Sequence, residues 1–266
     1  MSEARIRSGG NIISPEDPAF VAALGRGLSV IQTFGAGREQ QTLAEISKLT
    51  DLPRATVRRA LLTLQSLGFI ASDGKYFALT PSILSLGYAY LAATPLPRLL
   101  QPALESVSEK THESASATIL DGDEIVYIAQ AATKRIMSVG LCVGSRLPAF
   151  CTSMGRVLLA ARPPEEARAR LGAMNFRALT PQTQTDVEAL LDILARIRHD
   201  GYCLVDQELE LGLRSVAVPV RDAQGCVVAA MNVSAQAARV STNTLLTEML
   251  PVLRSASAAL TPALAG

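Results

Sequence analysis

Residues 42–79 carry, in order, the signals that a helix, a tight turn, a second helix and a β-hairpin require. Thr42 and Glu45 have the spacing of a capping box, in which the threonine accepts from an early helical N–H and the glutamate reaches back to the cap. A helix is therefore expected directly after Thr42. Asp51 tolerates left-handed geometry and Pro53 restricts the residue before it, so the chain is expected to turn there.

The second helix is expected over residues 53–67, with one apolar stripe at a spacing of about 3.6 residues. That stripe consists of Val57, Ala60, Leu61, Leu64 and Leu67. The other face carries Arg54, Arg58 and Arg59, and no acid occurs between residues 53 and 70. This face therefore has a local positive field, for which phosphate is a natural partner.

Two strands are expected at residues 69–72 and 75–79, because Asp73 and Gly74 between them form a strong hairpin signal. The whole stretch then reads as a winged helix-turn-helix, whose second helix lies in the major groove. An ordinary helix pair with a solvated basic face is the alternative interpretation. The candidate base and phosphate contacts are Arg54, Ala55, Thr56, Arg58 and Arg59, with Thr42 and Lys75 as candidate contacts to the DNA backbone.

The chain has 266 residues, of which 48% are apolar, and a net charge of +1. It is long enough for two domains with real cores, and any nucleic-acid binding must be local rather than general. We expect a flexible arm at residues 1–18, a DNA-binding domain at 19–80, a linker helix at 81–97 and a second domain at 98–266. The apolar residues of the linker helix are too numerous for one narrow face, so we interpret it as part of a dimer interface, or else as an ordinary buried helix.

The second domain alternates expected strands and helices, which favours an antiparallel sheet covered by helices, a common architecture for small-ligand sensing. The expected strands are 116–120, 124–129, 135–141, 202–205, 213–220 and 227–234. The expected helices are 98–112, 154–161, 165–171, 186–199 and 242–260.

No metal or cofactor is expected. The four cysteines, Cys142, Cys151, Cys203 and Cys226, have no C-x-x-C spacing, and only His112 and His199 are histidines. The N-terminus lacks the apolar core of a signal peptide and no run reaches transmembrane length, so a cytoplasmic protein with free thiols and no membrane partner is expected.

Cys151, Thr152 and Ser153 immediately precede an apolar helix. Small hydroxyls and free backbone N–H groups at a helix start can bind a carboxylate, or can serve only as a cap. A hydrolase built on Ser153 is disfavoured, because the first glycine of G-x-S-x-G is absent and the downstream His199 sits at a helix end. A redox role for Cys151 is disfavoured because no second cysteine is near in sequence.

A polar loop at residues 206–215 ends in Arg214 and Ser215 at an expected strand. It is either a solvated loop or, with Asn232 and Ser234 on the next strand, part of a pocket lined with hydrogen-bonding groups. The second interpretation follows because polar residues on a strand of Val, Ala and Met need partners.

The sequence resembles the IclR family of bacterial transcription regulators over nearly the whole chain, from about Phe20 to Leu260. The markers are residues 25–28, 52–59, 201–202 and 212–219, while residues 146–156 and 206–212 resemble the subgroup that governs β-ketoadipate pathway genes. The sequence departs from the family pattern at Asp51, where the family usually has a turn glycine, and at Arg58, where it often has histidine. It departs from the subgroup at Phe150, where tyrosine is common.

The resemblance implies an α/β two-domain fold, with a winged helix-turn-helix, a linker helix and a GAF-like α+β effector-binding domain. It implies a homodimer or homotetramer on an inverted-repeat operator and a small carboxylic acid effector, such as protocatechuate, 4-hydroxybenzoate or β-ketoadipate. By position, the effector candidates are Thr152, Ser153, Met154, Asp206, Ser215, Asn232 and Ser234. Arg135, Arg146 and Arg214 are alternatives for pairing with the carboxylate. A sensor module that does not bind DNA remains the competing class.

Overall fold

The structure is a computed structural model that describes residues 14, 16–35, 37–133 and 141–264. Its contacts divide the chain into two compact units, Met1–Ala93 and Thr94–Gly266. Residues 135–140 of the expected strand, including Arg135, and most of the expected N-terminal arm lie outside the described residues.

The first unit contains the expected helix-turn-helix. Its helices are α1 (Ala22–Ile31), α2 (Leu43–Thr50) and α3 (Arg54–Ser66). The capping box is present, since Thr42 Oγ1 accepts from Glu45 N at 3.4 Å and Glu45 Oε2 accepts from Thr42 N at 2.7 Å. Asp51 ends α2 in the left-handed region with φ 54°. The core between the helices comprises Val30, Ile46, Val57, Leu61, Leu64 and Ile70.

The wing follows α3 as the hairpin of β2 (Ile70–Ser72) and β3 (Tyr76–Leu79), with Gly74 at φ 99° in its turn. An unexpected strand, β1 (Gln40–Thr42), pairs with β3. Its three polar residues carry no alternation of apolar and polar positions from which a strand could be predicted. The expected linker helix begins as a 3₁₀ turn, η1 (Pro81–Ile83), and continues as α4 (Leu84–Ala93).

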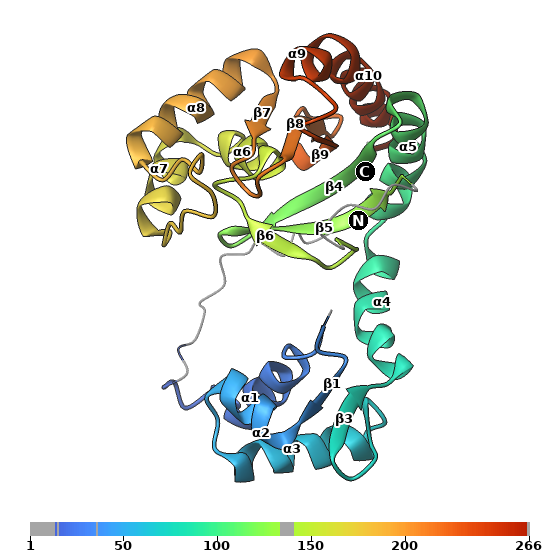
Figure 1. Cartoon of the computed structure of the whole chain (residues 1–266), viewed down its shortest axis with the longest axis vertical. Helices are drawn as coiled ribbons and strands as arrows, with labels where there is room; N and C mark the ends of the chain where they lie inside the picture. The colour runs from blue at the N-terminus through green and yellow to red at the C-terminus, as the bar shows by residue number, and fades with distance from the viewer. Residues whose placement is uncertain (1–13, 15, 36, 134–140, 265–266) are drawn as a thin grey trace. The chain divides into compact units, whose positions relative to one another are not determined.

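In the second unit, six of the described strands form one antiparallel sheet in the order β6-β5-β4-β9-β8-β7 (Figure 1). The strands are β4 (Ser114–Asp121), β5 (Glu124–Ala131), β6 (Arg146–Pro148), β7 (Cys203–Asp206), β8 (Leu213–Arg221) and β9 (Val227–Gln236). The short β6 was not predicted. The antiparallel sheet itself was.

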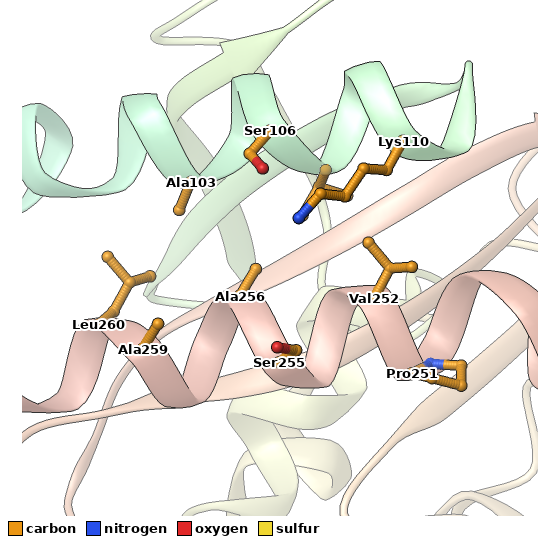
Figure 2. Close-up of a pocket in the computed structure, with 10 residues that line it drawn as sticks. Ala103, Ser106, Lys110, Pro251, Val252, Ser255, Ala256, Ala259 and Leu260 are labelled. Atoms are coloured by element: carbon orange, nitrogen blue, oxygen red, sulfur yellow. The ribbon is translucent and has the colours of Figure 1, made fainter.

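Helices cover both faces of this sheet. On one face lie α5 (Leu96–Thr111) and α10 (Leu250–Leu260), and on the other lies α6 (Ser153–Ala160), with α8 (Val187–Asp200) and α7 (Pro164–Ala173) packed beyond it. Figure 2 shows α5 and α10 side by side, with small side chains such as Ala103 and Ala256 between them. A groove of about 520 Å³ runs along this pair.

The helix expected over 242–260 has the ends that the structure shows, and prolines explain two differences of detail from the expected helices. α5 begins at Leu96, inside the expected linker 81–97, since Pro95 and Pro97 occupy the helix start, where a missing N–H is tolerated. The single helix expected over 242–260 is divided into α9 (Thr242–Thr244), a π-helical turn η2 (Leu245–Met249) and α10. Pro251 in the first turn of α10 cannot donate to the preceding turn, and the wider π turn absorbs this mismatch.

Candidate functional site

The two faces of the sheet in the second unit differ in polarity. The strand register places Ser234 opposite both Ser114 and Ser215, and Asn232 opposite Ser116. Residues directly opposite each other in an antiparallel pair share a face, so these polar side chains gather on the face that α6 covers. The other face, against α5 and α10, is apolar and carries residues such as Val216 and Val233. The second unit therefore contains a buried polar face of the sheet that is covered by a helix.

A small cavity lies between this polar face and the start of α6, with a volume open to water of about 40 Å³. Six of the seven predicted effector residues line it, namely Thr152, Ser153, Met154, Ser215, Asn232 and Ser234. Tyr127, Leu141, Cys151, Val205, Leu209 and Leu213 complete the lining. Asp206 does not line the cavity. Its carboxylate instead accepts from Arg214 at 2.9 and 3.1 Å.

The start of α6 presents free N–H groups to the cavity. Thr152 Oγ1 accepts from Gly155 N at 3.2 Å, which satisfies the third helical amide. Among the described residues, no group accepts from the amides of Ser153 and Met154, the first two of the helix. All eight residues of α6 are buried, so the positive end of the helix dipole is poorly screened by water. This geometry can hold a carboxylate.

Hydroxyl and amide groups face this helix start across the cavity. Ser153 Oγ lies 2.8 Å from Ser215 Oγ, which joins α6 directly to β8. Asn232 donates through Nδ2 to Ser234 Oγ at 2.9 Å, while its Oδ1 has no partner among the described residues. The Asn232 residue is only 4% exposed. A buried acceptor without a partner costs about 1–3 kcal/mol, and a ligand hydroxyl in the cavity can satisfy it.

Two of the three arginines considered for the carboxylate are already paired within the protein. Arg146 contacts Asp121 and Glu124, at 2.8 and 2.6 Å. Arg214 contacts Asp206 and also donates to the carbonyl oxygen of Val240 at 2.8 Å. The start of α6 thus supplies positive potential to the cavity without either side chain.

A buried ion pair that the sequence did not reveal fixes the loop beside the cavity. Arg156 on α6 is 2% exposed and donates through Nη1 and Nη2 to the two carboxylate oxygens of Glu208, both at 2.6 Å. Arg156 Nε also donates to the carbonyl oxygen of Phe150, and Glu208 accepts from Gln184 N at 2.9 Å. The pair therefore connects α6 to the loop that carries Leu209 over the cavity.

No histidine is among the described residues that line this cavity. Burial raises the pKa of Cys151 to about 12, although the nearby Arg156 opposes this shift, so its thiol stays protonated near neutral pH. The side chain of His199 is 90% exposed and contacts Asp200 at 2.8 Å. In the described part of the chain, no three His, Cys, Asp or Glu residues gather in a way that could hold a metal ion.

The predicted DNA-binding residues lie on the first unit. Arg54, Ala55, Arg58 and Arg59 are exposed on α3, and Thr56 is half-buried. The hydroxyl of Thr42 is engaged in the capping box. Lys75 lies in the wing, its ammonium 4.9 Å from the centre of the Tyr76 ring. The basic face of α3 is therefore open to solvent, as groove docking requires.

Polar residues on β4 were missed. Ser114, Ser116 and Thr118 are buried and alternate along β4, on the face that α6 covers. Their alternation is visible in the sequence, but only the pairing of β4 with β9 shows that they extend the same polar face as Asn232.

Known proteins match both units. Residues 23–74 match the IclR helix-turn-helix domain, and residues 88–261 match the family described as bacterial transcriptional regulator IclR C-terminal. Over 242 residues the chain is 49% identical to the Pca regulon regulatory protein of Pseudomonas putida, an alignment that covers 91% of this chain and 83% of that protein. No described helix is long and apolar enough to cross a membrane.

Solved structures show the same architecture. A transcriptional regulator from Rhodococcus sp. RHA1 has a TM-score of 0.81 and 47% identity, covering 92% of this chain and 98% of its own. The inducer-binding domain of the PobR transcription factor from Acinetobacter, a double mutant in complex with 3-hydroxybenzoic acid, has a TM-score of 0.59 and 35% identity. That match covers 62% of this chain and 96% of the PobR domain.

Proposed function

Because the chain belongs to the IclR family of bacterial transcriptional regulators, we propose that it controls genes of aromatic-acid catabolism by binding their promoters and releasing or retaining them in response to a small carboxylic acid. It acts in the cytoplasm, where the bacterial DNA lies, and it catalyses no reaction. The likeness to the Pca regulon regulatory protein supports this assignment of target genes.

The effector is a hydroxylated aromatic acid such as 4-hydroxybenzoate or protocatechuate; the aliphatic acid β-ketoadipate, which has no hydroxyl to donate to Asn232, is the alternative. The observation that carries this proposal is the polarity of the cavity between α6 and the sheet, although its present volume of about 40 Å³ means that the walls must move apart to admit an aromatic ring. Its helix start offers two free amides to an anion, and the unpartnered Oδ1 of Asn232 accepts from a hydroxyl. The PobR domain, which holds 3-hydroxybenzoic acid, shows that a relative's domain of this fold accepts a ligand of this chemistry.

A homodimer presents two copies of α3, one for each half of an inverted-repeat operator. A homotetramer is built from two such dimers. A groove of about 520 Å³ beside α1 and α3 has apolar residues such as Leu24, Leu28 and Leu67 in its wall and also Arg59, a proposed DNA contact, so only its part away from Arg59 supports the dimer proposal. Leu84, Leu86, Tyr88 and Tyr90 are also exposed on α4. Exposed apolar surface of this extent is typical of an interface.

The two parts of this function can be tested together by a gel-shift titration of the full-length protein on its own promoter fragment. We expect salt-sensitive binding that changes when 4-hydroxybenzoate, protocatechuate or β-ketoadipate is added. A thermal shift that depends on the concentration of one of these acids identifies the effector, because a ligand at a hundred times its Kd adds about 2.7 kcal/mol of stability. Ligand binding without any promoter binding supports the alternative of a sensor module.

A further inference from the structure

A second cleft of the effector-binding unit lies at the opposite end of α6 from the cavity described above. It has a volume of about 450 Å³ and is formed by the end of α6, the turn into α7, the end of α8 and the β8–β9 hairpin. Arg162, Arg198 and Arg221 line it, each from a different segment of the chain. Among the residues that the structure describes, no Asp or Glu lines the cleft.

Backbone acceptors fix two of these guanidinium groups. Arg198 Nε donates to the carbonyl oxygen of Ala160 at 2.8 Å, and Arg221 Nη1 donates to the carbonyl oxygen of Gly225 at 2.8 Å. Each guanidinium has five N–H donors, so each keeps several for a ligand. The backbone N–H of Arg162 donates to the carbonyl oxygen of Leu159, whereas its guanidinium has no partner within the described part of the chain.

We propose that this cleft binds a small polyanion, a molecule with two or more carboxylate or phosphate groups. All three arginines are exposed at the cleft, where they are free to meet a ligand, and arginine forms planar, two-point hydrogen bonds with carboxylate and phosphate. The volume of the cleft falls in the range of about 300–1,000 Å³ that is typical of small-molecule sites. This site is separate from the effector cavity and does not depend on which aromatic acid binds there.

The test is isothermal titration calorimetry of the full-length protein in a buffer of low ionic strength that contains no phosphate. Citrate represents the polycarboxylates and pyrophosphate represents the phosphates. The probe that binds with the lower Kd shows whether the cleft prefers carboxylate or phosphate groups. We expect Arg162→Gln/Arg221→Gln to weaken binding of that probe by about tenfold or more. The matched control is Arg177→Gln, which removes an exposed arginine outside the cleft and should leave binding unchanged.

Three outcomes contradict the proposal: neither probe binds the parent protein, the double variant binds as well as the parent, or the control variant loses as much affinity as the double variant. A urea unfolding transition of the double variant that matches the parent protein shows that the variant is folded. A loss of citrate or pyrophosphate binding in a variant with that transition therefore supports the second site.

Discussion

The guanidinium of Arg156 and the carboxylate of Glu208 form a two-point ion pair across the wall of the effector cavity, 52 residues apart in sequence. Glu208 is 13% exposed, so both charges are largely removed from water. Such a pair is costly to break, because the remaining charge stays buried without a partner. The pair therefore holds the loop that contains Leu209 in one position beside the cavity.

Glu208→Gln should consequently destabilise the protein by about 3–5 kcal/mol, as measured by urea unfolding of the second unit within the full chain. The double variant Arg156→Met/Glu208→Leu is the control, because it removes both charges and keeps much of the apolar volume. We expect the double variant to be more stable than Glu208→Gln. Equal stability of Glu208→Gln and the parent protein would show that the pair contributes little.

Gly155 allows the chain before α6 to pack directly on the helix. A Cβ atom added there would lie 2.2 Å from the carbonyl oxygen of Ala149 and 2.4 Å from its Cα. Gly155→Ala should therefore displace the start of α6, destabilise the protein by about 1–3 kcal/mol or more and weaken effector binding. Gly172→Ala on α7 is the control, because nothing lies within 4 Å of its added Cβ. The free energy of unfolding of the Gly172→Ala variant should rise by about 0.4–1 kcal/mol. An equal change in the free energy of unfolding of both variants would contradict the steric clash at Gly155.

Arg58 and Arg59 are exposed on α3 and are expected to contact the operator. If one of these arginines reads a base, its change to alanine should cost about 1–3 kcal/mol of DNA-binding free energy and relax the base preference at one operator position. The loss of a phosphate contact should instead weaken all sequences and reduce the salt slope by about one. Fluorescence anisotropy at several salt concentrations separates the two cases, with Arg98→Ala on α5 as the control. Unchanged binding by a folded double variant would mean that another surface meets the DNA.

The cysteines should divide into two classes by reactivity. Burial raises the pKa of Cys151 and of Cys203 to about 12, whereas Cys142 and Cys226 are exposed. Because the thiolate is the reactive form, only about one part in ten thousand of a thiol with that pKa is reactive at pH 8. An aromatic disulfide reagent at pH 8 should therefore label two thiols rapidly and the other two only on unfolding. Rapid labelling of all four in the folded protein would contradict the buried placement.

The sequence was sufficient for features that depend on neighbouring residues. The capping box of Thr42, the turn at Asp51 and the hairpin at Gly74 each follow from local chemistry, and the structure contains all three. The gathering of Ser153, Ser215 and Asn232 was predicted partly from the family resemblance, since the three residues come from three different elements. The Arg156–Glu208 pair could not be predicted, because its partners meet only after the helix and the loop have packed together.

Register explains the other misses. Ser114, Ser116 and Thr118 look like ordinary polar positions on a strand until β4 is paired with β9. Asp206 was an effector candidate by its position in the family resemblance, but it pairs with Arg214 across β7 and β8 at the sheet edge. Local sequence contains no information on which of two adjacent carboxylates, Asp206 or Glu208, turns inward.

Calorimetry of the full-length protein with the effector acid, its methyl ester and its analogue without the hydroxyl tests whether a carboxylate rests on the start of α6 while Asn232 accepts from the ligand's hydroxyl. We expect the ester and the analogue to bind much more weakly than the acid, Ser153→Leu to abolish binding, and Asn232→Ala to remove the advantage of the hydroxyl. Ser255→Leu, outside the cavity on α10, should bind normally. Binding of the acid by Ser153→Leu as tightly as by the parent protein would place the effector elsewhere.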